Sequence, residues 1–360
     1  VGSEMCIRDR VYSEPIPLQY PKVGTTNSAV RVGVVDIESA ETIWVKLQGD
    51  PRQNYVPQMD WAASSEQLII QYVNRLQNRY QVLLANAADG SVQHIFTDND
   101  DAWIDANEDV KWLAEGEYFT WLSERDGWRH LYIVSRDGKD VRLVTPGDFD
   151  IIKVDHIDTA NGWVYYTASP DDNAARYLFR SPLTGDPAVE RLTPKSESGW
   201  HEYDVATNSE WAFHTFSTLN KPPVVDIVSL PEHISQRTVV DNDTVEERLQ
   251  AMPQVKTEFF NVDIGDDVEL DGWMLKPPDF DPGKKYPLLM FVYGEPASQT
   301  VIQRWRSGRG NRHLWHWMLA LQGYIVASVD NRGTPAPRGR AWRKSVYGQI
   351  GILGPDDQAR

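Results

Sequence analysis

Short strand-like segments separated by turns make up the first three quarters of the chain. Apolar and aromatic residues come in runs of four to six, as at residues 68–72 and 131–134, and Gly, Asp, Asn or Pro stands between the runs. Few segments before about residue 310 show the 3.6-residue period of an amphipathic helix. The pattern therefore predicts a mainly β structure for this part.

The strand pattern also repeats along the chain. The matched strands start near Ile69, Phe119, Val164 and Ala212, which gives steps of about 50, 45 and 48 residues. A period of about 40–50 residues with several strands per unit is typical of a β-propeller, whose four-stranded blades stack on one another. A large β-sandwich with accidental spacing is the alternative. Residues 29–47 are predicted to be the outer half of an earlier blade, giving four to five blades.

The pattern changes near residues 242–254. A short helical linker begins at Asp243, and two paired strands follow. The uninterrupted apolar run at 288–293 predicts a parallel strand that is buried on both faces. Further segments alternate between helix and strand: a helix at 312–322, a buried strand at 324–330, and helical segments at 341–347 and 355–360. This alternation predicts the start of an α/β domain.

Composition and charge exclude several classes of protein. The chain has 360 residues, 39 of them aromatic, and a net charge of −16. This composition excludes disorder as the main state, and the acidic balance argues against a nucleic-acid partner. A single cysteine, Cys6, excludes an intramolecular disulfide and a cysteine-based metal site. No run of about 18 apolar residues is present, so we expect no membrane span.

Four motifs together resemble the prolyl oligopeptidase family of serine peptidases, in its dipeptidyl peptidase IV branch. They follow the family order and spacing from about Tyr20 to Arg360. The motifs are Gln19-Tyr-Pro-Lys-Val-Gly24 with Asn27, Asp126-Gly-Trp-Arg-His-Leu-Tyr132, Lys285-Tyr-Pro-Leu-Leu-Met-Phe-Val-Tyr-Gly294, and Val329-Asp-Asn-Arg-Gly-Thr334 with Arg338-Gly339 and Gly348. The resemblance implies a β-propeller followed by an incomplete α/β-hydrolase domain.

We accordingly expect three parts along the chain. Residues 1–10 are polar and are predicted to be a tail that is not native sequence. Residues 11–250 are expected to be a partial propeller, and residues 251–360 the truncated N-terminal part of the catalytic domain. About 110 residues do not complete a doubly wound domain of the usual size.

Acyl transfer on this scaffold needs a Gly-x-Ser-x-Gly turn, then an acid, then a histidine. No Gly-x-Ser-x-Gly occurs in the sequence. In the family, the nucleophile follows the element that begins here at Pro355, so the resemblance implies that the whole triad lies beyond Arg360. The acidic pair that binds the substrate amino terminus is expected outside the chain as well.

One catalytic group of the family has a counterpart here, Tyr293. The resemblance implies that its hydroxyl donates to the oxyanion of the tetrahedral intermediate, where a preoriented donor stabilises the developing charge. The alternative is a core tyrosine that ends a buried strand. The family usually has Gly or Ala where this chain has Glu295, whose carboxylate would oppose an oxyanion unless it points away.

Glu108 is a second, weaker candidate, for substrate binding. It lies with Asn107 and Asp109 on a predicted blade loop, and an ordinary exposed loop is the alternative.

Two further groups of residues are weighed and set aside. His313 and His316 are three residues apart on a predicted helix, so both could bind one metal ion, but no third ligand is near in the sequence and packing in the core is favoured. An arginine cluster follows Tyr293 and is interpreted as a surface loop; it consists of Arg304, Arg306, Arg309 and Arg312.

The resemblance implies a serine exopeptidase that releases dipeptides from peptide amino termini, with no cofactor. This fragment alone is expected to be inactive. Two alternatives stay open: an oligopeptidase or acylaminoacyl peptidase of the same fold, and a non-catalytic propeller interaction protein, which Glu295 favours. The expected partner is a peptide, the resemblance is compatible with a homodimer, and it implies an exported or periplasmic protein.

Overall fold

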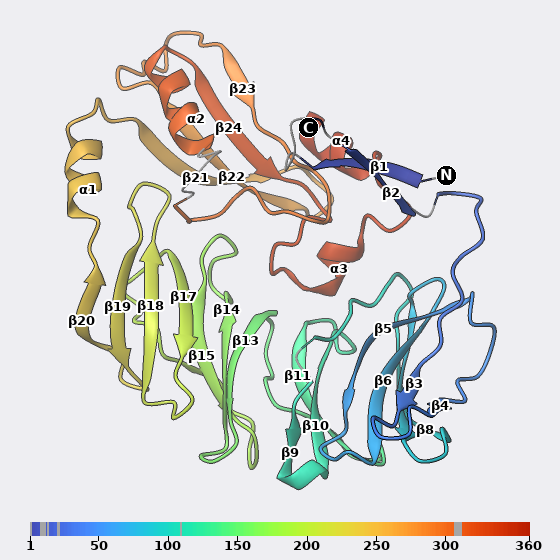
Figure 1. Cartoon of the computed structure of the whole chain (residues 1–360). Helices are drawn as coiled ribbons and strands as arrows, with labels where there is room; N and C mark the ends of the chain where they lie inside the picture. Colours follow the sequence, from blue (N-terminus) through green and yellow to red (C-terminus); the bar gives the residue numbers. More distant parts are fainter. Residues whose placement is uncertain (1, 8–11, 13, 20–21, 109, 306–311) are drawn as a thin grey trace. The chain divides into compact units, whose positions relative to one another are not determined.

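The computed structural model describes residues 2–7, 12, 14–19, 22–108, 110–305 and 312–360 (Figure 1). The chain forms two compact units, residues 1–108 and 109–360. Each unit is described by itself.

In the part that the structure describes, the first unit has one four-stranded sheet and two short hairpins. The hairpins are β1 (Gly2–Ile7) with β2 (Glu14–Gln19), and β3 (Gly33–Val35) with β4 (Thr42–Trp44). The sheet is an antiparallel meander of β5 (Asn54–Trp61), β6 (Gln67–Asn74), β7 (Arg79–Asn86) and β8 (Val92–Asn99). One of its faces packs on residues next to β3 and β4, because Leu68 and Ile70 share a buried cluster with Val32 and Val45. The strand predicted at 68–72 lies inside β6.

The second unit begins with three more antiparallel meanders. The first comprises β9 (Trp112–Leu113), β10 (Tyr118–Ser123), β11 (His130–Ser135) and β12 (Val141–Leu143), with a 3-10 turn at Ala114–Gly116. The second comprises β13 (Ile151–Asp158), β14 (Trp163–Ala168), β15 (Tyr177–Pro182) and β16 (Glu190–Arg191). The third comprises β17 (Trp200–Val205), β18 (Trp211–Ser217), β19 (Val224–Ser229) and β20 (Ile234–Val240).

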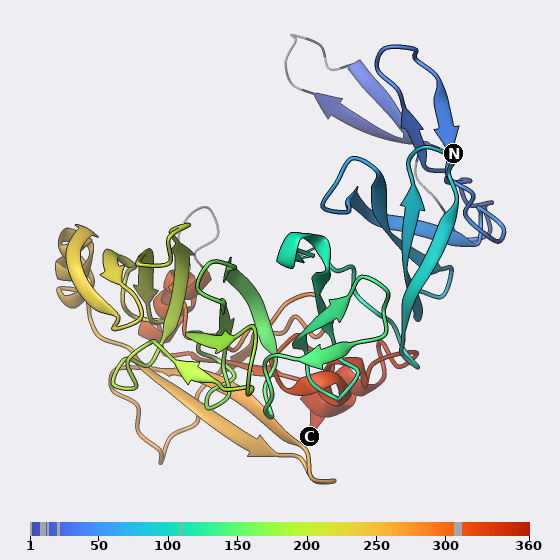
Figure 2. The same ribbon diagram turned by 90° about the horizontal axis from the view of Figure 1, so that it is seen from below.

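These three sheets stack side by side, as Figure 2 shows. The middle sheet is apolar on both faces. Its Val164 and Tyr166 pack with the preceding sheet in one buried cluster, whereas Tyr165 and Leu178 pack with the following sheet in another. A sandwich would cover only one face of each sheet. Stacking on both faces is the arrangement of propeller blades.

A mixed sheet follows the meanders. Helix α1 (Asp243–Gln250) precedes this sheet. Its strands are β21 (Lys256–Asp263), β22 (Glu269–Lys276), β23 (Leu288–Met290) and β24 (Ile325–Asp330). Helix α2 (Arg312–Leu321) lies between β23 and β24 in the sequence, and helices α3 (Gly339–Lys344) and α4 (Leu353–Ala359) follow β24. The strand order is β21-β22-β24-β23, and only β23 runs parallel to β24. Helix α2 lies against β22 and β24 (Figure 1), where Trp317 and Ala320 contact Leu275 and Val326. Within the described residues, no helix combines the length and apolar character that crossing a bilayer requires.

The prediction of a long buried strand at 288–293 is wrong in length and in burial. Strand β23 ends at Met290, and Leu288 and Met290 are 58% and 42% exposed. The physical reason is that β23 is an edge strand. Leu289 and Phe291 point to the core beside α2, whereas the alternate side chains face no apolar layer in the described residues. The parallel pairing with β24 agrees with the prediction.

Candidate active site

Tyr293 lies on the loop that follows β23, at the carboxyl end of the parallel pair. The backbone N–H of Phe291 still donates to the carbonyl of Ala327 (2.8 Å), and the Phe291 carbonyl accepts from Ser328 Oγ (2.6 Å). The Tyr293 side chain is 45% exposed, unlike the core residue Tyr166 at 0%. Ligands of open α/β sheets bind outside the carboxyl ends of the strands. The phenol is therefore where a ligand of this sheet would be expected.

A buried asparagine fixes the backbone directly after Tyr293. Asn331 is fully buried, and its Nδ2 donates to the carbonyls of Gly294 (3.3 Å) and Arg332 (2.8 Å). Gly294 has φ +78°, a conformation that glycine adopts without strain. The space is tight, because a Cβ on Gly354 would lie 3.2 Å from Asn331 Nδ2. The Tyr293 side chain is thus exposed while its backbone is held.

Asp330 holds the far end of the same loop. Its Oδ1 accepts from the backbone N–H of Thr300 (2.9 Å) and from Thr300 Oγ1 (2.6 Å), and its Oδ2 accepts from the N–H of Val301 (2.9 Å). Burial raises the pKa of Asp330, and these donors offset only part of that effect. The segment between Gly294 and Thr300 is therefore short and attached at both ends.

Glu295 is exposed to solvent. Water and salt screen the charge of an exposed carboxylate from groups that are not in direct contact with it. The expected conflict with an oxyanion next to Tyr293 is therefore weaker than a buried carboxylate would cause.

Glu108 is the last residue of the first unit and is exposed. Its neighbour Asn107 is buried and is held by Gln71, whose Nε2 donates to the Asn107 carbonyl (2.6 Å). Tyr293 belongs to the second unit, so the two candidate residues are described separately. Asp109 lies outside the described residues.

The histidine pair and Arg304 have ordinary surroundings. His313 is 4% exposed and contacts Asn220 Oδ1 through Nε2 (3.1 Å), whereas His316 packs between Trp273 and Phe291. The two imidazoles therefore face different neighbours, as core packing predicts. Arg304 forms an ion pair with Glu202 (2.7 Å). Arg306 and Arg309 lie outside the described residues.

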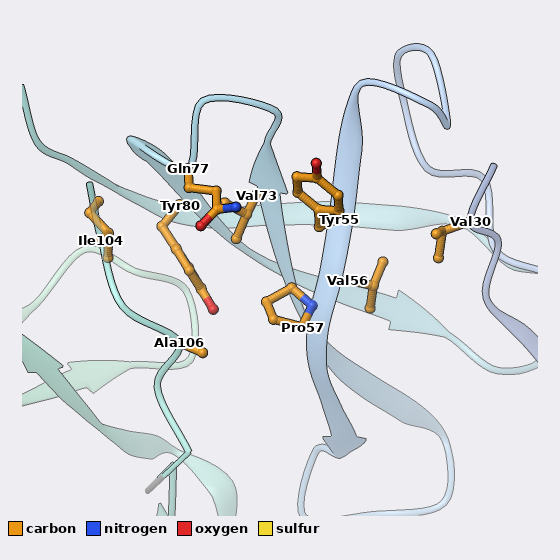
Figure 3. Close-up of a pocket in the computed structure, with 9 residues that line it drawn as sticks. All are labelled: Val30, Tyr55, Val56, Pro57, Val73, Gln77, Tyr80, Ile104 and Ala106. Carbon is orange, nitrogen blue, oxygen red and sulfur yellow. The ribbon is translucent and has the colours of Figure 1, made fainter. Parts of the chain in front are cut away.

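Each unit has a cavity among its described residues, and Tyr293 lines neither of these two. The first, of about 380 Å³, is mainly apolar and is lined by Val30, by residues of the β5–β7 meander and by the segment 104–106 (Figure 3). In the second unit, a cavity of about 390 Å³ lies between Trp112 and residues 154–159. Neither cavity could be predicted from the sequence, since each is formed by side chains far apart along the chain.

Sequence reasoning also missed the residues that hold the Tyr293 loop. Asn331 and Asp330 stand inside the Val329–Thr334 motif, so the motif itself was a signal for them. Arg176 and Asp172 come from the β14–β15 connection, and their side chains bond to Gln299 and Gln303. No sequence pattern connects these positions.

Comparison with known proteins places this architecture in a family. The family model described as "Dipeptidyl peptidase IV (DPP IV) N-terminal region" matches residues 4–223. A probable dipeptidyl peptidase 4 of Emericella nidulans is 27% identical over 96% of this chain and 46% of its own length. A probable dipeptidyl-aminopeptidase B of Botryotinia fuckeliana is 29% identical over 96% of this chain and 38% of its own length.

Solved structures of dipeptidyl peptidases are also similar to this chain. The crystal structure of Porphyromonas gingivalis dipeptidyl peptidase 4 matches with a TM-score of 0.88 and 30% identity, over 99% of this chain and 49% of that one. A putative dipeptidyl aminopeptidase IV from Bacteroides ovatus, at 22% identity and a TM-score of 0.84, shares the fold. The chain spans about half the length of these relatives, or less. The predicted β-propeller fold is confirmed, with a mixed sheet after it, and the chain belongs to the dipeptidyl peptidase IV family.

Proposed function

We propose that this chain is part of a serine peptidase that releases dipeptides from the amino termini of peptides. The observation that carries the proposal is the exposed phenol of Tyr293 on a loop held at Gly294 and Thr300, at the carboxyl end of β23. The names of the relatives support the same activity. The nucleophilic serine, its acid and its histidine are proposed to follow residue 360.

In this mechanism the serine hydroxyl gives its proton to the proposed histidine and attacks the carbonyl carbon of the substrate's second residue, and the histidine then protonates the amine that leaves. Negative charge develops on the carbonyl oxygen, and the Tyr293 hydroxyl donates a hydrogen bond to it. The backbone N–H after the serine is the proposed second donor. A donor whose backbone is already fixed needs no reorganisation when the charge appears, which is the physical basis of such stabilisation.

The test is a peptidase assay of the longer protein that carries this chain. Glycyl-prolyl p-nitroanilide has a free amino terminus, and its N-acetylated form does not. We expect release of nitroaniline from the first substrate and at least about a hundredfold slower release from the second, because an exopeptidase of this kind binds the free ammonium group. The leaving group and the dipeptide are the same in both, so they serve as a matched pair.

Other outcomes separate the alternative functions. Equal cleavage of both substrates would indicate an oligopeptidase, and preference for N-acetylalanyl p-nitroanilide would indicate an acylaminoacyl peptidase. Absence of cleavage of all three, together with peptide binding, would favour a non-catalytic interaction protein. Any of these results would overturn the proposed dipeptidase activity.

Glu108 is proposed to assist substrate binding. We expect Glu108→Gln to raise KM about two- to fivefold with kcat unchanged, because an exposed charge contributes at most about 1 kcal/mol. Glu66→Gln, at another exposed glutamate of the first unit, is the matched control and should leave KM unchanged. Equal KM values for the Glu108→Gln variant and the parent protein would exclude the role.

A further inference from the structure

Arg176 is a buried cation at the start of a blade strand. It is 5% exposed and stacks over the Trp200 ring at 4.4 Å. Its guanidinium Nη1 donates to the carbonyls of Asn173 (3.0 Å) and Ala175 (2.6 Å). Among the described residues, no carboxylate lies within ion-pair distance of it, and burial lowers the pKa of Arg176 to about 10.

The contacts of Arg176 with Asn173, Ala175 and Trp200 stay within the propeller and account for only part of its bonding. The Asp172 carboxylate attracts the guanidinium electrostatically without forming an ion pair, and burying a cation in this way is costly, so apolar residues often serve a core as well. The Nε of Arg176 is buried without a hydrogen-bond partner, which adds to the cost. The arginine also donates one hydrogen bond to a residue outside the blade.

That bond reaches the loop after Tyr293. Arg176 Nη2 donates to Gln299 Oε1 (2.8 Å), across 123 residues of sequence. The Gln299 amide nitrogen in turn donates to the carbonyls of Asn173 and Val301, each at 2.9 Å. Gln299 is 9% exposed, and its carboxamide is satisfied at both ends. The blade therefore fixes Gln299 from outside the mixed sheet.

A second blade residue makes a parallel contact. Asp172 Oδ2 accepts from Gln303 Nε2 (2.6 Å), and the backbone N–H of Gln303 donates to the Ala174 carbonyl (2.8 Å). The β14–β15 connection thus holds the loop at two glutamines.

Only four residues, 295–298, separate Gly294 from Gln299. Such a segment spans at most about 14 Å when extended. A shift of Gln299 is therefore transmitted to Gly294 and to the tyrosine before it. Asn331 fixes the loop from the mixed sheet, and Arg176 fixes it from the blade.

We propose that Arg176 is a positioning residue for Tyr293: the propeller, through the Arg176–Gln299 bond, holds the loop that carries the oxyanion donor. The inference rests on the proposed function of Tyr293. Arg176 does not touch substrate, and it acts through Gln299.

The first experiment needs no catalysis. Hydrogen exchange is measured on the 360-residue chain for the amides of Thr300 and Val301. Arg176→Met keeps an unbranched stem over Trp200 and removes every donor, and we expect about tenfold faster exchange at these amides. Arg180→Met is the matched control, because Arg180 lies in β15, directly after the connection that carries Arg176, stacks on Trp163 at 4.2 Å and pairs with Glu190. It should leave the two amides unchanged.

The second experiment uses the longer protein and its peptidase activity. We expect Arg176→Met to lower kcat about tenfold with KM changed less than about twofold, because the loss concerns the transition state. In a Tyr293→Phe background, the same change should lower kcat less than about twofold further, since the donor it positions is absent.

Three results would overturn the inference. They are unchanged exchange at Thr300 and Val301 in Arg176→Met, the same change in Arg180→Met, or a full tenfold loss of kcat in the Tyr293→Phe background. If the longer protein cleaves no peptide at all, the proposed function fails and the inference about Tyr293 fails with it. The exchange experiment then still decides whether Arg176 holds the loop.

Discussion

Replacing Tyr293 by phenylalanine in the longer protein is expected to lower kcat about 10²–10³-fold, while KM changes less than about twofold. The substitution removes one hydroxyl and keeps the ring. Loss of one oxyanion donor has a cost of this size in acyl-transfer enzymes. Because the charge exists only in the transition state, substrate binding is nearly unaffected.

Tyr324→Phe is the matched control. Tyr324 precedes β24 in the same sheet and is 36% exposed, close to the exposure of Tyr293. It should retain the parent kcat. If Tyr293→Phe lost no more activity than Tyr324→Phe, Tyr293 would not be the oxyanion donor. Circular dichroism of both variants checks that the fold is intact.

The last blade is expected to lose stability as the pH falls from 7 to 5. His201 and His214 are 1% and 4% exposed, their rings stack at 5.1 Å, and His201 Nδ1 and His214 Nε2 lie 2.8 Å apart. His233 packs edge-on against His214 at 4.9 Å, and its Nε2 lies 2.7 Å from Tyr203 Oη. The three imidazoles therefore form one cluster that is largely buried from solvent.

Burial determines the direction of the effect. It lowers the pKa of His201 to about 4 and that of His214 to about 3, and it also lowers the pKa of His233. The unfolded chain takes up protons near pH 6.5, whereas the folded blade resists them. The contribution of the cluster is complete above pH 6.5 and is lost progressively below it. We expect a loss of roughly 2–4 kcal/mol in the free energy of unfolding between pH 7 and pH 5.

Urea unfolding at the two pH values measures this loss. In a double variant, His201→Phe with His214→Phe, both hydrogen-bonding partners are replaced together, and most of the pH dependence should disappear. His94→Asn, at an exposed histidine, is the control and should retain it. Buried carboxylates such as Asp150 and Asp330, whose pKa burial raises, act with the opposite sign. An unchanged pH dependence in the double variant would contradict the assignment to the histidines.

The blades could be predicted from sequence because they are local. Each is a meander in which consecutive strands pair, so the repeat of about 50 residues is the repeat of the structure itself. The Asp89-Gly90 turn, by contrast, is constrained by a residue that is distant in sequence. Gly90 has φ +70°, and a Cβ there would lie 2.2 Å from the carbonyl oxygen of Trp44, so this turn requires glycine.

The burial of β23 could not be predicted, because it depends on strand order. An apolar segment has the same sequence pattern in a central strand and in an edge strand. Only the non-local pairing β22-β24-β23 places β23 at the edge of the sheet. The supports of Tyr293 are non-local as well: Asn331 reaches Gly294 across 37 residues and Arg176 reaches Gln299 across 123. Tyr293 itself was found by resemblance, and its role stays a prediction.

A serine-directed fluorophosphonate probe is the most direct test of the proposal that Tyr293 stabilises an oxyanion formed by a serine after residue 360. Its phosphoryl oxygen occupies the oxyanion position after the serine has attacked, so labelling needs both the nucleophile and the donors. We predict that the longer protein is labelled at a serine after residue 360, that Tyr293→Phe slows this labelling, and that the 360-residue chain is not labelled. Labelling of a residue within this chain, or equal rates with and without the Tyr293 hydroxyl, would contradict it.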